Sequence, residues 1–308
     1  MTENSARCSY VLITPARNEE AFIEKTIESV LKQTVLPTKW VIVDDGSTDR
    51  TPDVVRRYLP ACPWIEMVQM PQRQNRSFAA KVQAFNAGYE RVRGLRYDVL
   101  GNLDADISFD GDYIEFLLAQ FSDDFRLGVA GTTFREAGYS SEKDSFEGRN
   151  HVAGGCQLFR AQCFEEIGGF IPNEGGGVDW IAVTTARMMG WKTRSFREKF
   201  FLHHRHLGTA ERNPIAANFS YGGKDYYLGG HPIWELFRIA YRMTKRPYIV
   251  GGLALGWGYA WAMVRRIRRP ISTELMTFHR REQMHKLGAV LGAVLTLRSV
   301  DSFNVLPD

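Results

Sequence analysis

The chain has 308 residues, of which 44% are hydrophobic and 24% charged, with a net charge of +4. These proportions are typical of a globular protein with a sizeable core, and they exclude a disordered or a fibrous chain. The four scattered cysteines argue against a disulfide framework and predict reduced thiols in the cytosol, and residues 1–9 contain no apolar signal core that would indicate export.

The first half of the chain alternates short apolar runs with segments of helical periodicity. This alternation predicts a parallel sheet that is covered by helices on both faces, with ligands bound beyond the carboxyl ends of its strands. Asp49 is a candidate N-cap for the second helix, with Pro52 in its first turn. The expected strands are 10–14, 40–43, 65–68, 97–103 and 129–133, and the expected helices are 21–31, 53–58, 77–92 and 113–121.

The second half is less regular. Residues 136–149 are polar and predict a mobile loop, and residues 157–170 predict a strand, a short helix and a stop at two glycines. A helix is expected over 181–189, and strands are expected over 191–196 and 200–202. We therefore expect one domain over 1–230, with a nucleotide-binding half at 1–133 and an acceptor half at 134–230.

Residues 231–308 form a basic and apolar tail. They contain 12 Lys and Arg against 5 Asp and Glu, whereas the remaining 230 residues contain 27 against 30. The uncharged run Ile249 to Val264 has basic residues on both flanks and falls short of the about 20 apolar residues that a membrane span needs. This pattern favours a helical segment lying on an anionic membrane surface over a nucleic-acid partner, and the alternative is a solvated basic helix packed on the domain.

Three carboxylate clusters follow apolar runs in a fixed order along the chain. They are Asp44-Asp45, Asp104-Ala105-Asp106 and Asp179. Two carboxylates one residue apart at the exit of a buried strand direct their oxygens toward one place, which suits a hard divalent cation and the phosphates that it carries. An Asx-rich turn is the alternative for one cluster alone.

These motifs together resemble the family 2 nucleotide-sugar glycosyltransferases over about residues 9–205. The segments that carry the resemblance are Thr14 to Glu20, Val43 to Asp49, Asn86-Ala87-Gly88, Asp104 to Asp106, and Gly168-Gly169-Phe170 followed by Asp179. The resemblance implies the type A glycosyltransferase fold, which is an α/β fold with a Rossmann-like, mostly parallel sheet flanked by helices. It also implies an inverting transfer.

The resemblance implies a donor site with a metal ion. Asp106 would bind Mg²⁺ or Mn²⁺ at the donor diphosphate, Asp104 would lie near the ribose, and His204 is a candidate further ligand whose alternative is a structural hydrogen bond. A UDP-sugar is the expected donor because the family uses it most. The base and ribose would be held by the two preceding loops, through Thr14, Pro15, Arg17, Glu19, Asp44 and Asp45.

The transfer chemistry needs a cation and a base. Arg73, Arg76 and Lys81 are candidates to neutralise the leaving diphosphate, and the alternative for each is an ordinary surface cation. Asp179 is the candidate base for the acceptor hydroxyl, and its alternative role is a helix N-cap. The family usually has Glu-Asp at this position, but this chain has Val178-Asp179, and Glu174 is the residue that would compensate.

We therefore expect a metal-dependent inverting glycosyltransferase on the cytoplasmic face of the cell membrane. The expected acceptor is a lipid-linked sugar or a glycan in cell-envelope or exopolysaccharide synthesis. The Gln and Arg-Trp motif of processive synthases is not seen, which favours single addition. A non-catalytic scaffold and, less favoured, a sugar-nucleotide pyrophosphorylase remain alternatives, whereas a glycoside hydrolase does not fit two carboxylates on one tight turn.

Overall fold

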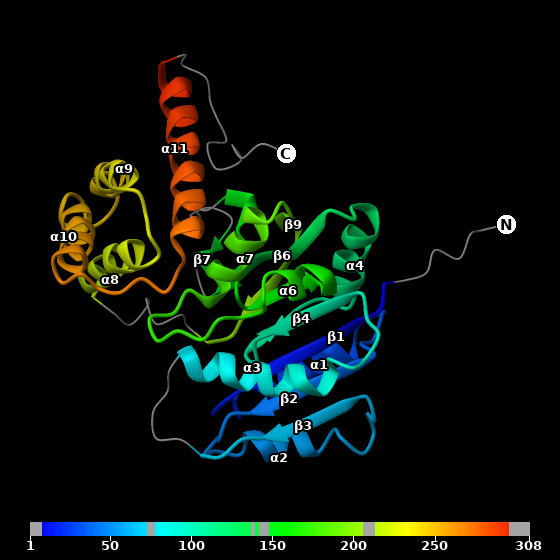
Figure 1. Cartoon of the computed structure of the whole chain (residues 1–308). Coiled ribbons are helices and arrows are strands. Elements are labelled where there is room, and N and C mark those ends of the chain that lie inside the picture. The colour runs from blue at the N-terminus through cyan, green and yellow to red at the C-terminus, as the bar shows by residue number, and fades with distance from the viewer. Residues whose placement is uncertain (1–7, 73–77, 137–138, 142–147, 206–212, 296–308) are drawn as a thin grey trace. The chain divides into compact units, whose positions relative to one another are not determined.

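The computed structural model describes residues 8–72, 78–136, 139–141, 148–205 and 213–295. The chain divides into two compact units, Met1–Arg205 and His206–Asp308 (Figure 1). The second unit begins before the predicted boundary at residue 230. The reason is that helix α8 (Pro214–Tyr227) packs closely against helix α10 (Val250–Val264) and belongs with the tail.

A nine-stranded sheet forms the centre of the first unit. Its order is β3-β2-β1-β4-β8-β6-β9-β5, and β7 pairs with β6. The half made of β3, β2, β1 and β4 is parallel, as expected, and beyond it β8 runs antiparallel between β4 and β6. The strands are β1 (Tyr10–Ala16), β2 (Lys39–Asp44), β3 (Ile65–Gln69), β4 (Val99–Leu103), β5 (Ile107–Ser108), β6 (Leu127–Glu136), β7 (Tyr139–Ser140), β8 (Cys156–Arg160) and β9 (Lys192–His203).

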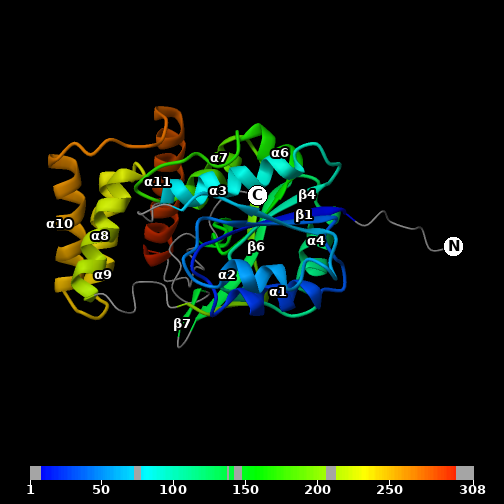
Figure 2. The ribbon, with the colours of Figure 1, turned by 90° about the horizontal axis from the view of Figure 1, so that it is seen from below.

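Helices cover both faces of this sheet (Figure 2). One apolar cluster joins α1 (Ile23–Leu31), α2 (Thr51–Arg56) and α4 (Tyr113–Asp123) to one face. The other cluster joins α3 (Phe78–Val92), α6 (Ala161–Glu166) and α7 (Val178–Met188) to the opposite face. The strands β1, β2 and β4 are buried along their length, which explains why their sequences are apolar runs without a polar face.

Gly88 explains why one predicted motif needs a glycine. A Cβ at Gly88 would lie 2.6 Å from Ile13 Cγ2 and 3.0 Å from Val43 Cγ2. Helix α3 therefore approaches β1 and β2 at a distance that only glycine permits. Gly88 fixes the C-terminal half of α3 on the sheet, and Lys81 lies about two turns before it in the same helix.

The sequence-based elements are mostly confirmed, with differences in the segments 136–149 and 191–202. The two strands expected over 191–196 and 200–202 form the single strand β9. Its pairing with β6 continues across a register shift, because Thr132 pairs with Phe196 and the next residue, Thr133, pairs with Phe200. The polar segment 136–149 contains strand β7 and the start of a 3₁₀ turn at Gly148–Asn150, and residues 137–138 and 142–147 lie outside the described residues.

Asp49 does not cap helix α2 as a side-chain N-cap. Arg50 occupies that position without a side-chain hydrogen bond. The Asp49 carboxylate instead accepts hydrogen bonds from the Thr51 backbone N–H at 3.0 Å and from the Thr51 hydroxyl at 2.6 Å. The carboxylate thus ties down the loop before the helix.

The second unit is helical in its described residues. Its helices are α8, α9 (Pro232–Met243), α10 and α11 (Thr273–Leu295). Helices α8 and α10 meet at glycines: a Cβ at Gly222 would lie 1.9 Å from the Leu255 carbonyl oxygen, and one at Gly258 would lie 1.9 Å from the Phe219 carbonyl oxygen. Across the described helices, none combines the length and the apolar character needed to cross a bilayer.

Candidate functional site

Loops from several strands meet at one edge of the sheet in the first unit. Ala16 pairs with Asp44, and Leu103 pairs with Cys156, so the loops after β1, β2 and β4 and the loop before β8 share this edge. Strand β9 runs parallel to β6 and ends here at His203, which pairs with Ile107. The arrangement brings residues near positions 20, 45, 105, 155 and 205 to one location, as the parallel order predicts for its first three loops.

Asp104, Asp106 and His203 form a candidate metal site. One ligand atom from each residue lies within 4.8 Å of the others, and His203 Nε2 is 3.5 Å from Asp106 Oδ1. His203 Nδ1 contacts the Arg205 carbonyl oxygen. Because a carbonyl only accepts hydrogen bonds, this contact places a proton on Nδ1, so Nε2, which faces Asp106, is the ring nitrogen able to bind a metal. Two carboxylates and one imidazole suit Mn²⁺, and with substrate phosphates they also suit Mg²⁺.

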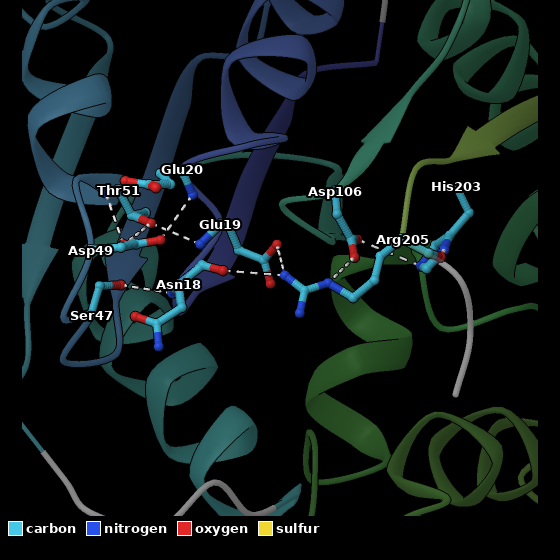
Figure 3. A network of polar contacts seen from close by, with 9 residues as sticks. All are labelled: Asn18, Glu19, Glu20, Ser47, Asp49, Thr51, Asp106, His203 and Arg205. Carbon is cyan, nitrogen blue, oxygen red and sulfur yellow. Dashed lines mark hydrogen bonds and ion pairs between the residues drawn. The ribbon is translucent and has the colours of Figure 1, made fainter. Parts of the chain in front are cut away.

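Each carboxylate of this group has a basic partner. Lys81 Nζ donates to Asp104 Oδ1 at 2.5 Å, and Arg205 Nε lies 3.4 Å from Asp106 Oδ2. The Arg205 guanidinium also binds the Glu19 carboxylate and donates to the Asn18 carbonyl oxygen at 3.2 Å (Figure 3). Arg205 therefore joins the loop after β1 to the candidate metal ligand Asp106.

The charged groups of this site shift one another's pKa values. The Lys81 side chain is 46% exposed. Its partial desolvation opposes its charge, but attraction to Asp104, then to Asp106 and Asp179, raises its pKa above the ordinary value. Burial raises the pKa of Asp104; Lys81 opposes this rise, and repulsion by Asp106 adds to it. Lys81 is therefore an ammonium ion at neutral pH, and Asp104 takes up a proton at a higher pH than an isolated aspartate.

His204, the predicted third ligand, points elsewhere. Its Nε2 is 2.8 Å from Ser108 Oγ, and its ring stacks on Phe22 at a centroid distance of 6.3 Å. Burial, followed by repulsion from Lys25, lowers the pKa of His204, so its ring is neutral at pH 7. Adjacent strand residues point to opposite faces, which is why His203 and not His204 joins the group.

The loops after β1 and β2 form one polar network (Figure 3). Asn18 has a φ of +56° and donates its backbone N–H to Ser47 Oγ at 3.0 Å, while its side-chain oxygen accepts from the Thr48 N–H at 2.8 Å. The Glu19 N–H donates to Thr51 Oγ1 at 2.7 Å. These bonds hold the predicted nucleotide-binding loops together.

The predicted donor-binding residues of the first two loops fall into three groups. Thr14 and Pro15 are buried within β1, and the Thr14 hydroxyl accepts a hydrogen bond from Trp40 Nε1 at 3.0 Å, so Thr14 serves the core. Arg17 and Glu19 lie in the loop. Residues Asp44 and Asp45 are buried at the end of β2, where Asp44 accepts from the Ser47 N–H at 3.1 Å and from Gln69 Nε2 at 3.4 Å.

Asp179 lies in the first turn of α7. The N-cap position is Gly177, which has a φ of +78°, so Asp179 is not the N-cap. Asp179 Oδ2 would be 2.9 Å from a Cβ at Gly154, and the Asp179 charge contributes to the raised pKa of Lys81. Asp179 is half-buried, whereas Glu174 is exposed.

Two residues of the group were not singled out from the sequence as site residues. His203 is the last residue of β9, and Arg205 follows it two positions later, just beyond the strand. The spacing alone does not link them to Asp104 and Asp106, because the pairing of β5 with β9 that brings them there has no local signal. Arg73 and Arg76, which were proposed as diphosphate-binding residues, lie outside the described residues.

The sequence matches the model of one protein family, Glycosyl transferase family 2, over residues 11–168, which is just over half of the chain. Glycosyltransferase AglE of Haloferax volcanii is 30% identical over 192 residues, covering 56% of this chain and 60% of AglE. Chondroitin synthase of Pasteurella multocida is 30% identical over 121 residues, covering 39% of this chain and 12% of the synthase. The chain thus spans less than two thirds of either relative.

Solved structures share the fold at low sequence identity. Mannosyltransferase PcManGT from Pyrobaculum calidifontis, solved with GDP-Man and Mn²⁺, has a TM-score of 0.54 at 19% identity, covering 95% of this chain and 81% of PcManGT. S. aureus TarS 1–349 in complex with UDP-GlcNAc has a TM-score of 0.54 at 13% identity, covering 96% of this chain and 89% of the TarS chain.

Proposed function

The chain belongs to glycosyl transferase family 2 and is a glycosyltransferase, and we propose that it transfers a sugar from a nucleotide-sugar donor with a divalent cation held by Asp104, Asp106 and His203. The observation that carries this proposal is the convergence of two carboxylates and one imidazole within 4.8 Å. A bound Mg²⁺ or Mn²⁺ would neutralise the charge that develops on the leaving nucleoside diphosphate.

Lys81 supplies a second positive charge for the leaving group. Its ammonium is already held at Asp104, and its raised pKa keeps it protonated at neutral pH. A fixed cation at the place where charge develops stabilises the transition state more than the ground state. Lys81 therefore lowers the barrier to departure of the diphosphate.

The donor nucleotide is bound by the loops after β1 and β2. Asp44 or Asp45 accepts the N–H of a uracil or guanine ring, and the loop of Arg17 and Glu19 contacts the ribose. The neighbouring structures were solved with GDP-Man and with UDP-GlcNAc, so this fold accommodates both bases. A UDP-sugar is our first choice of donor.

Asp179 acts as the base for the acceptor hydroxyl. Its half-buried carboxylate lies on the Lys81 side of the site, and a neutral alcohol needs such a base to become a nucleophile. Direct displacement at the anomeric carbon then inverts its configuration.

The acceptor is a lipid-linked sugar or a glycan at the cytoplasmic face of the membrane. Two relatives have names that refer to polysaccharide synthesis: chondroitin synthase and a putative teichuronic acid biosynthesis glycosyltransferase, TuaG of Bacillus subtilis. The basic tail supports a peripheral or monotopic location, because anionic lipids attract clustered Lys and Arg.

The proposal is tested by donor turnover. UDP-, GDP- and dTDP-sugars are incubated with the protein and membrane lipid extract, with Mn²⁺ or with a chelator, and release of nucleoside diphosphate is measured. Metal-dependent release from one donor class is expected, with an inverted anomeric configuration in the product. Consumption of nucleoside triphosphate instead would favour the pyrophosphorylase, and failure to bind any donor would favour the scaffold.

A further inference from the structure

Helix α10 exposes large apolar side chains along one side. The residues that it buries include Gly251, Gly252, Gly258 and Ala262, which are small. Leu255 and Tyr259 are buried with them, but the other large apolar residues point outward: Leu253 is exposed to 57%, Trp257 to 65% and Val264 to 75%. Water-soluble helices normally do the reverse and bury their large apolar side chains against the core.

These outward residues form one continuous stripe. Their spacing of three or four positions places them on one side of a helix. We name this stripe the α10 face, and it consists of Val250, Leu253, Trp257, Trp261 and Val264, all of which are exposed.

The neighbouring helices follow the same pattern. In α9, Glu235 is buried while Ile233 and Leu236 are exposed. In α8, Asn218 is buried and accepts a hydrogen bond from Arg242 Nε at 2.7 Å. Polar and small groups thus lie inside the helical unit beside Trp234, Leu255 and Tyr259. Glycines let α8 and α10 approach closely, as in helices that pack within lipid.

The charge around the α10 face has a single sign. Between Glu235 and Glu274 the sequence contains eight Lys and Arg and no Asp or Glu. Lys245 and Arg246 precede the helix, and Arg265 and Arg266 follow it, all four exposed. The Arg265 guanidinium lies over the Trp261 ring at 4.6 Å, which keeps an aromatic ring and a cation together at the end of the stripe.

The length of the helix decides how it meets a membrane. Fifteen residues rise about 22 Å along a helix axis, which is less than the about 30 Å of a bilayer core. Basic residues at both ends also fit a helix that lies along the headgroups better than one that crosses them.

We propose that the α10 face is a docking surface for an anionic lipid bilayer, with Leu253, Trp257 and Trp261 inserted among the acyl chains and the flanking cations on the lipid phosphates. This inference rests on the membrane location in the proposed function and names the surface responsible for it. It does not depend on the sugar chemistry, because no residue of the first unit takes part.

The test is co-sedimentation of the full chain with vesicles of phosphatidylcholine, with and without phosphatidylglycerol. The wild-type chain binds the anionic vesicles. Replacing Leu253, Trp257 and Trp261 together by Ser weakens binding about tenfold or more, because three apolar side chains are lost from the interface. The double change Arg265→Gln and Arg266→Gln weakens binding to anionic vesicles by at least about fivefold and leaves binding to neutral vesicles unchanged.

Phe125→Ser is the matched control, since Phe125 is an exposed aromatic residue of the first unit. This variant binds vesicles as the wild type does. The inference is overturned if the triple variant binds vesicles as well as the wild type does. It is also overturned if the wild type does not bind vesicles but forms a dimer that dissociates in the triple variant. Metal-dependent donor binding without vesicles, measured on the same samples, reports separately on the proposed function.

Discussion

At the scale of single residues, the site places acids and bases in pairs. Lys81 is bound to Asp104, and Arg205 is bound to both Glu19 and Asp106. Glu19 and Asp106 are buried and Asp104 is partly buried, and pairing with a cation offsets the free-energy cost of removing their charges from water. A cation that binds Asp106 must therefore act in the field of an existing positive charge.

The two adjacent histidines give the sharpest residue-level comparison. His203→Ala should weaken Mn²⁺ binding by at least about tenfold, because it removes a nitrogen that faces Asp106. His204→Ala should leave Mn²⁺ binding within about twofold, because that ring pairs with Ser108. Titration followed by the electron paramagnetic resonance of free Mn²⁺ measures both, and equal losses would contradict the assignment.

Arg205→Gln should tighten the binding of Mn²⁺ alone. The guanidinium beside Asp106 repels an incoming cation, and its removal should lower the Kd by about tenfold. Arg57→Gln is the control, because Arg57 forms an exposed ion pair with Glu24 away from the site. Weaker Mn²⁺ binding in Arg205→Gln would mean that Arg205 serves chiefly to position Asp106.

The pH dependence of metal binding follows from Asp104. A metal needs the ionised carboxylate, so Mn²⁺ affinity should fall as the pH falls through the raised pKa of Asp104. Lys81 holds that pKa down, so Lys81→Met should move the loss of affinity to higher pH. Affinity measured against pH checks this, and the shift should disappear in an Asp104→Asn background.

At the scale of elements, local periodicity was a good guide where strands and helices follow one another. The strands β1, β2 and β4 are apolar runs, and α1 shows clear helical spacing, so each could be predicted from neighbouring residues. The pairing of β5 with β9 joins residues almost a hundred positions apart and has no local signal. That pairing selects His203, which is why the carboxylates could be predicted but their histidine partner could not.

Gly88 allows a test of the packing that supports the site. Gly88→Ala places a methyl group 2.6 Å from Ile13 Cγ2 and should lower the free energy of unfolding by about 1–3 kcal/mol. Gly94→Ala should change it by less than about 0.5 kcal/mol, because no atom lies within 4 Å of the added methyl group. Urea unfolding of both variants measures the difference, and equal stabilities would show that α3 does not pack tightly on β1.

At the scale of the whole molecule, net positive charge and exposed apolar side chains are concentrated in the tail. The surplus of basic residues in 231–308 could be counted in the sequence, but which apolar residues face outward depends on the glycine contacts between α8 and α10. Vesicle binding by the full chain should weaken by about tenfold or more when the NaCl concentration rises from about 0.05 M to about 0.5 M. The reason is that salt screens the attraction between exposed charges and anionic lipids. Co-sedimentation across this range checks it, and salt-independent binding would point to apolar insertion alone.

The central claim is that the carboxylates after β4 bind the metal that holds the donor. It is tested most directly by calorimetry of UDP- and GDP-sugar binding with Mn²⁺ and with a chelator, for the wild type and for Asp106→Asn. Asp112→Asn is the control, because Asp112 pairs with Lys199 at the surface. The account predicts metal-dependent binding to one nucleotide class, lost by at least about 100-fold in Asp106→Asn and kept in Asp112→Asn. Equal binding by Asp106→Asn and the wild type in the presence of Mn²⁺ would contradict it.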